Sequence, residues 1–159
     1  MNTVVVRMSG MAVSSQRNDV LATYSLGSCL GIAMHDAVAG MGGMIHCMLP
    51  DSTIHAAKAT ERPCMFVDTG VPLLLREFLS AGSRREDLVV RAAGASCMMP
   101  DEQAFMIGRR NREACLSILG KNGLTLSASS VGGNSSRSIS LDISTGRLVV
   151  RQHGRETEI

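Results

Sequence analysis

Short apolar runs recur along the chain at lengths typical of β-strands. They occupy residues 2–6, 20–24, 29–34, 44–49, 88–92 and 124–130. Runs of this length, bounded by glycine, proline or polar residues, predict buried strands. Turns are predicted at 25–28 and 40–43, where glycine supplies backbone freedom, and Pro50 ends the fourth run. Residues 51–62 are polar and irregular, which predicts a surface loop or a short helix.

A first helix is predicted after this polar segment. Asp68 or Thr69 is expected to cap it, with Pro72 in its first turn. Gly82 is expected to end it. Its apolar positions recur at helical spacing: Leu74, Leu75, Phe78 and Leu79.

A second helix and a hairpin are predicted in the C-terminal half. One face of this helix carries Ile107, Asn111, Ala114, Cys115, Ile118 and Leu119. The helix is expected to close near Gly120 or Gly123. Apolar and polar residues alternate over 139–143, and a turn at 144–146 leads into 147–151, which predicts a hairpin. Strands in meanders and hairpins, with two helices between them, favour an α+β fold over a doubly wound sheet.

Composition places the chain among ordinary globular domains. Apolar residues make up 45% and charged residues 19% of its 159 residues. We therefore expect one domain over residues 1–159, able to bury a core without a metal or disulfide. Eleven methionines are compatible with a methionine-rich interior, which we expect, or with an adaptable partner surface.

Several classes of partner are disfavoured. The net charge is only +2, and one Tyr, three Phe and no Trp leave little to stack on bases, so nucleic-acid binding is not expected. No apolar run reaches the roughly 18 residues of a spanning helix, and the N-terminus lacks the features of a signal peptide. Five cysteines, an odd number, predict reduced thiols and a cytoplasmic location.

Cys29 is the first candidate for chemistry. It follows a glycine-containing turn and begins an apolar run, so one side is accessible and the other is supported. Gly27 leaves room for a substrate carbonyl beside backbone N–H groups, and we expect an oxyanion site at Gly27 and Ser28. The alternative is that Cys29 is a small core residue, as most cysteines are.

His46 lies within another apolar run and is a candidate base for this thiol. A buried imidazole must be hydrogen-bonded, and most such residues are structural. A Cys-His pair on neighbouring strands is nevertheless a common route to a thiolate, because an adjacent imidazolium lowers the thiol pKa. His35, in a predicted turn, His55, in a polar loop, and His153, in a charged tail, are weaker candidates.

Other chemistries fit the sequence less well. Cys29, His46, Cys47 and Cys64 could bind zinc, but no C-x-x-C or H-x-x-x-H spacing joins them, so no metal or cofactor is expected. Ser28 lacks the flanking glycines of a G-x-S-x-G elbow. The phosphate-binding glycine patterns are also absent from the sequence.

Two of these segments together resemble a known family. Residues 23–29 read Thr-Tyr-Ser-Leu-Gly-Ser-Cys and resemble the T-x-x-L-G-S-C signature of the chemoreceptor glutamine deamidases, the CheD family. Residues 42–50 resemble its G-G-x-x-H-x-M-L-P segment. Weaker matches follow in order at 67–68, 107–111 and 131–134. The resemblance spans residues 15–151, and the chain departs from the family pattern at Ser130, Ser136 and Ala93.

The resemblance implies a fold, a site and partners. The fold would be a three-layer α+β sandwich with helices on one side, similar to toxin-type glutamine deamidases. The site would be Cys29, His46 and Thr23, with Thr23 orienting the imidazole. The substrates would be glutamines of chemoreceptor cytoplasmic domains, and a CheC-type phosphatase would be a partner. The alternative function is a non-catalytic module that regulates chemoreceptors or such a phosphatase.

Overall fold

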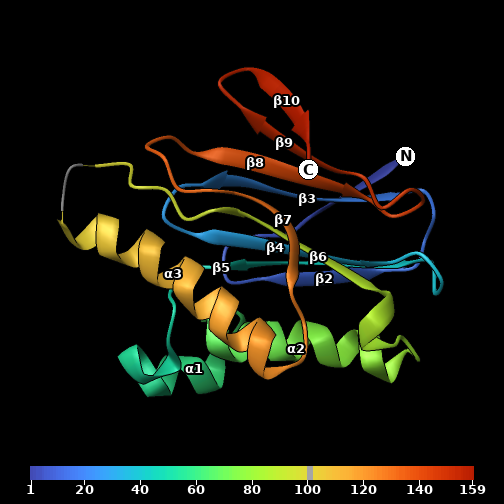
Figure 1. Ribbon diagram of the computed structural model, residues 1–159, viewed down its shortest axis with the longest axis horizontal. Coiled ribbons are helices and arrows are strands. Elements are labelled where there is room, and N and C mark those ends of the chain that lie inside the picture. Colours follow the sequence, from blue (N-terminus) through green and yellow to red (C-terminus); the bar gives the residue numbers. More distant parts are fainter. Residues whose placement is uncertain (100–101) are drawn as a thin grey trace.

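Two five-stranded sheets and a layer of helices make up the fold. A computed structural model describes residues 1–99 and 102–159 (Figure 1). The first sheet has the strand order β1 (Asn2–Val5), β3 (Asp19–Leu26), β8 (Arg137–Asp142), β9 (Leu148–Gln152), β10 (Arg155–Glu158). The second has the order β2 (Met11–Ser14), β5 (Met41–Cys47), β4 (Leu30–Asp36), β6 (Leu88–Gly94), β7 (Leu126–Val131).

The helices cover the face of the second sheet that points away from the first (Figure 1). They are α1 (Ala56–Glu61), α2 (Val67–Ser80) and α3 (Glu102–Lys121), with short 3-10 turns at Ser52–His55, Pro63–Met65 and Arg85–Asp87. Both sheets are mixed, since β1 pairs with β3 and β6 with β7 in parallel while the other pairs are antiparallel. The α+β class and the three layers are therefore confirmed. None of the helices in the described part of the chain is long and apolar enough to cross a membrane.

Two apolar clusters hold the layers together. Between the sheets lie Leu21, Leu26, Met44, Ile139 and Leu141; between the second sheet and the helices lie Ile32, Met34, Ile45, Leu74, Phe78 and Leu119. Methionines contribute to both clusters, but Met98 and Met99 are 48% and 63% exposed. The expectation of interior methionines is thus confirmed for only part of the set.

Two predicted glycine turn residues lie inside a strand instead. Gly42 and Gly43 belong to β5, and the turn precedes them at 37–40. A Cβ on Gly42 would come within 2.5 Å of Ile143 Cδ1, and one on Gly43 within 2.8 Å of Leu74 Cδ1. These glycines let the neighbouring layers approach the strand from both sides, a packing role that local sequence does not distinguish from a turn.

The N-terminus of α2 also differs from the prediction. Neither Asp68 nor Thr69 caps the helix, because Phe66 occupies the N-cap without a side-chain bond and Pro72 lies beyond the first turn. The Asp68 carboxylate instead accepts hydrogen bonds from the backbone N–H and hydroxyl of Ser52, at 2.9 and 2.7 Å. It therefore fixes the 3-10 turn that precedes α1.

Candidate active site

A bulge in β3 sets the direction of Thr23. The pairing of β3 with β8 shifts register between Thr23 and Leu26, and Ser25 has a φ of +58°. Strict alternation would send one of Thr23 and Leu26 to the outer face, but the bulge allows both to be fully buried between the sheets. The Thr23 hydroxyl therefore lies in the same layer as the facing side chains of β5.

His46 reaches Thr23 from the facing sheet. Met44 of β5 packs between the sheets and Ile45 packs toward the helices, so alternation directs His46 to the inter-sheet layer. His46 Nδ1 lies 2.7 Å from Thr23 Oγ1, and that hydroxyl donates to the Val6 carbonyl at 2.7 Å. Since the one hydroxyl proton goes to Val6, Thr23 accepts from His46, which assigns the proton to Nδ1.

The other imidazole nitrogen is therefore a free acceptor. His46 Nε2 is buried and has no hydrogen-bond partner among the described residues. A buried polar atom without a partner is costly, and such atoms concentrate at functional sites. This nitrogen is the atom that a general base would use.

Cys29 lies diagonally across from His46, just before the adjacent strand β4. It immediately precedes β4, in which Gly31 pairs directly with His46 of β5. Cys29 and Gly31 are two residues apart and share a face, so Cys29 is a diagonal neighbour of His46. At that separation the imidazole of His46 can reach the Cys29 side chain. The thiol is half-buried and packs against the inter-sheet cluster. The structure thus brings the three predicted residues into one layer.

The β3–β4 turn, residues 27–29, is tied to the segment after β6. The backbone N–H of Ser96 donates to the Gly27 carbonyl, and that of Ala95 to the Cys29 carbonyl, both at 2.8 Å. Gly94 has a φ of +107°, and a Cβ there would come within 2.3 Å of the Cys29 carbonyl oxygen. Only glycine fits this close approach, and it lets β6 hold the turn from behind.

These hydrogen bonds orient the backbone N–H groups of the turn in the direction opposite to the bound carbonyls. The carbonyl and N–H of a trans peptide unit point in opposite directions, so fixed carbonyls fix the amides as well. The Gly27 N–H is already used, since it donates to the Ser25 carbonyl at 3.0 Å. No other residue in the described part of the chain accepts from the Ser28 or Cys29 N–H, and the Cys29 N–H faces the residue's own sulfur. Donors for an oxyanion are thus available at Ser28 and Cys29, whereas Gly27 supplies space and not a free N–H.

Burial determines the charge state of the pair. It raises the pKa of the Cys29 thiol, an effect that the residue's own backbone N–H opposes in part. Burial also lowers the pKa of His46. Both shifts favour the uncharged forms, a thiol and a neutral imidazole, at neutral pH. Burial therefore acts against the thiolate that a Cys-His pair is expected to form, because buried ions are costly.

The remaining cysteines and histidines lie elsewhere. All five cysteines are free thiols, and burial raises the pKa of Cys47, Cys64 and Cys115, the last to about 12. His35 is in β4, not in a turn, and bonds through Nε2 to the Ile143 carbonyl at 3.0 Å. His55 lies in an exposed 3-10 turn. No group of three potential metal ligands occurs within residues 1–99 and 102–159.

The structure places His153 and Asn111 differently from the sequence-based prediction. His153 lies in the turn between β9 and β10, an antiparallel hairpin where the sequence predicts a charged tail. Its Nε2 lies 2.9 Å from the Ser135 hydroxyl oxygen. Asn111, assigned to an apolar helix face, donates from Nδ2 to the Ser28 carbonyl at 2.9 Å and the Met48 carbonyl at 3.0 Å. The only signal for this contact was a polar residue within an apolar stripe.

Comparisons with known proteins show the family of this chain. The sequence model of the family described as "CheD chemotactic sensory transduction" matches residues 48–152, more than half of the chain. The chain belongs to the CheD family. A relative from Solibacter usitatus, named "Probable chemoreceptor glutamine deamidase CheD", is 42% identical over 159 residues, covering 100% of this chain and 94% of the relative.

Other CheD relatives are similar over nearly the same length. "Probable chemoreceptor glutamine deamidase CheD 1" of Syntrophus aciditrophicus is 36% identical and covers 97% of this chain and 96% of its own. A relative of the same kind from Thermococcus kodakarensis is 32% identical and covers 87% and 86%. The family match begins at residue 48, after Cys29 and His46, so the long pairwise similarities are the ones that span the site.

Proposed function

We propose that this CheD-family protein is a cytoplasmic cysteine hydrolase, with a single catalytic domain over residues 1–159, that deamidates chemoreceptor glutamines to glutamate. Cys29 is the nucleophile, His46 its general base and acid, and Thr23 the positioning residue that holds the imidazole. The supporting observation is the chain from the Val6 carbonyl through Thr23 to His46 Nδ1, which leaves a buried Nε2 lone pair in the layer of the Cys29 thiol. The names of the relatives supply the substrate class.

The first half of the reaction forms a thioester. His46 Nε2 takes the thiol proton as Cys29 sulfur attacks the amide carbon of the glutamine side chain. The resulting oxyanion accepts hydrogen bonds from the Ser28 and Cys29 amides. The imidazolium then gives its proton to the departing nitrogen, the C–N bond breaks, and ammonia leaves.

The second half restores the enzyme. His46 Nε2 removes a proton from water as the water oxygen attacks the thioester carbon. The C–S bond breaks, the sulfur takes back a proton from His46, and the side chain leaves as glutamate. Throughout, Nδ1–H remains bonded to Thr23, so the ring does not have to turn between the two steps.

Incubation with chemoreceptor cytoplasmic fragments tests the function. Ammonia release and conversion of glutamine to glutamate, read by peptide mass, should occur with the wild type and fail with Cys29→Ala and His46→Ala. Cys97→Ala is the matched control, because that thiol bonds to the Met99 carbonyl and lies outside the Cys-His-Thr group. Conversion at an equal rate by Cys29→Ala would refute the assignment.

A non-catalytic role is the alternative. A module that only regulates chemoreceptors or a phosphatase would bind the fragments without releasing ammonia. A CheC-type phosphatase belongs to the proposal as a partner, and co-purification of the two proteins with and without receptor fragment tests it. Binding of fragments by a folded wild-type protein that never converts glutamine would favour this alternative.

A further inference from the structure

One buried side-chain amide joins the β3–β4 turn, which carries Cys29, to the segment just after β5, the strand that carries His46. Asn111 of α3 is fully buried, and its Nδ2 donates to the carbonyls of Ser28 and Met48. Ser28 precedes the nucleophile, and Met48 lies two residues after His46 and one residue beyond β5. The segments that carry the thiol and the imidazole are therefore held by the two hydrogens of one NH₂ group.

We propose that Asn111 is a positioning residue for the deamidation reaction, which orients the Ser28–Cys29 peptide unit and fixes its distance from the His46 strand. This rests on the proposed function. The Ser28 carbonyl and the Cys29 N–H belong to the same planar trans unit and point in opposite directions. By holding the carbonyl in the interior, Asn111 directs the Cys29 N–H toward the reacting side.

The two amides of the turn are set by two separate donors. The Ser96 N–H holds the Gly27 carbonyl and so orients the Ser28 N–H, as Asn111 does for the Cys29 N–H. A hydrogen bond to a carbonyl also polarises its peptide unit, which makes the N–H of that unit a stronger donor. Asn111 therefore strengthens the amide as well as aiming it.

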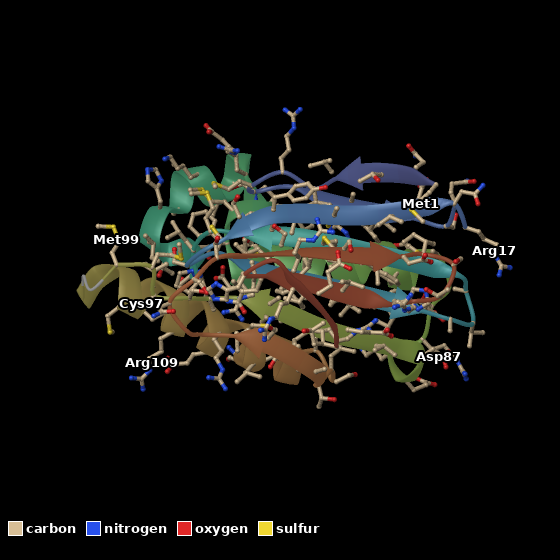
Figure 2. All side chains as sticks on the ribbon, turned by 90° about the horizontal axis from the view of Figure 1, so that it is seen from above. Met1, Arg17, Asp87, Cys97, Met99 and Arg109 are labelled. Atoms are coloured by element: carbon tan, nitrogen blue, oxygen red, sulfur yellow. The ribbon has the colours of Figure 1, made fainter. Side chains whose placement is uncertain are left out.

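The approach of α3 to the turn depends on Gly108. This glycine lies three residues before Asn111 and shares its helix face. A Cβ there would come within 2.8 Å of the Ser96 carbonyl oxygen and within 2.9 Å of the Ala95 carbonyl oxygen. The glycine permits the close contact that brings the Asn111 amide within bonding distance, at the end of the molecule where the β3–β4 turn meets α3 (Figure 1). Cys97 and Arg109, which lie close to these residues in the chain, are at this same end (Figure 2).

The unused atom of the side chain supports a functional role. Asn111 Oδ1 is buried without a partner among the described residues. An apolar residue on this helix face would avoid that cost but would leave two carbonyls unbound. Asn111 therefore acts through its two N–H donors, and both donate to carbonyls beside the candidate active site.

Variants of Asn111 in α3 and of Asn122, the residue just after α3, provide the test. Asn111→Ala removes both bonds; Asn122→Ala is the matched control, because Asn122 Nδ2 donates to the Ile118 carbonyl at 2.8 Å at the far end of α3. With receptor fragment, Asn111→Ala should lower kcat on the order of 10²-fold with KM changed little, the usual effect of a misplaced oxyanion donor. Asn122→Ala should leave kcat at the wild-type value.

A second measurement separates positioning from stability. The rate of Cys29 alkylation by iodoacetamide, followed against pH, should have a higher midpoint in Asn111→Ala than in Asn122→Ala, because the Cys29 N–H no longer faces the sulfur. Asn111→Asp has the same shape and, when protonated, one donor, so its kcat should lie between those of wild type and Asn111→Ala. It provides the comparison if the alanine variant does not fold.

Two results would overturn the proposal. One is a folded Asn111→Ala or Asn111→Asp variant with wild-type kcat. The other is a loss of kcat with an unchanged alkylation midpoint, which would reduce Asn111 to a stability residue. Failure of the proposed function is distinguishable, since the wild type would then release no ammonia while the alkylation midpoint still shifted in the Asn111 variants.

Discussion

Replacing Thr23 by valine or serine separates its hydroxyl from its methyl group. Thr23 is fully buried, accepts from His46 Nδ1 and donates to the Val6 carbonyl, each at 2.7 Å. Valine keeps the size and loses both bonds. Serine keeps both bonds and loses only a methyl group. The two variants thus change different properties of one buried position.

The magnitudes follow from what each variant leaves behind. Thr23→Val leaves the His46 N–H and the Val6 carbonyl buried and unpaired, at about 1–3 kcal/mol of unfolding free energy for each group. Thr23→Ser costs about 0.5–1.5 kcal/mol, as for a deleted core methyl. If one such bond orients the imidazole in the transition state, its loss of about 1–3 kcal/mol lowers the rate about 5- to 150-fold.

Steady-state deamidation of a receptor fragment measures this effect. We expect Thr23→Val to lose kcat within that range and Thr23→Ser to stay near wild type, at temperatures where denaturant unfolding shows both to be folded. Equal kcat values for the two variants would refute the reasoning, because the hydroxyl would then have no part in orienting His46. A loss in serine alone would assign the effect to packing.

Four further predictions concern the same site. His46→Ala should lose on the order of 10²–10⁴ in kcat while remaining folded, since it removes a general base; a near-normal rate would make His46 structural. Iodoacetamide at neutral pH should label Cys29 before the other cysteines, because His46 can take the thiol proton as the sulfur attacks and so offsets the raised pKa. His46→Ala should therefore slow labelling of Cys29 but not of Cys97, as read by peptide mass. Burial lowers the pKa of His46 and raises that of Cys29, so kcat/KM should stay level from below pH 6.5 to above pH 9.0. It should fall on the acid side as His46 gains a proton and on the alkaline side as Cys29 loses one. An acid limb centred above pH 6.5 would contradict the lowered pKa of His46. Gly94→Ala should destabilise the fold and abolish activity, because its Cβ would lie 2.3 Å from the Cys29 carbonyl oxygen; denaturant midpoints and kcat equal to wild type would show that this contact does not hold the turn.

The lowered pKa of His46 also has a consequence for stability. Because the folded protein binds this proton less tightly than the unfolded chain, the stability contributed by the neutral imidazole is fully present above about pH 6.5. It is lost as pH falls through the pKa of the folded state. Denaturant unfolding of wild type and His46→Gln across this window isolates the contribution, since glutamine does not titrate there.

Local patterns identified the parts of the fold that have regular periodicity. The β8–β9 hairpin, β6 and the apolar face of α3 could be predicted because alternation or helical spacing extends over several residues. The four-residue strands β2 and β10 lie at the edges of their sheets, where too few positions are buried to produce a pattern. The role of Gly42 and Gly43 depends on Ile143 and Leu74, which are far away in sequence.

The candidate site was predictable for a similar reason. Cys29 and His46 differ chemically from the apolar residues around them, so each stands out within its own run. Thr23 was identified only by resemblance, because a threonine in a strand is ordinary. Asn111 was missed because its two partners are backbone carbonyls, one in the β3–β4 turn and one after β5, which only the folded chain brings together.

A threonine partner for His46 suits a site that is uncharged at rest. A carboxylate at this position would stabilise the imidazolium and raise the pKa of His46, so that the base would already be protonated before it could take the thiol proton. The Thr23 hydroxyl accepts a hydrogen bond from Nδ1–H without adding charge, and it donates its own hydrogen bond to the Val6 carbonyl. The imidazole thus keeps its orientation and its free Nε2 lone pair while burial keeps it neutral. In the proposed mechanism, charge develops only when substrate is present, and the Ser28 and Cys29 amides would stabilise the oxyanion. The cost of forming ions would then be met in the transition state and not in the free protein.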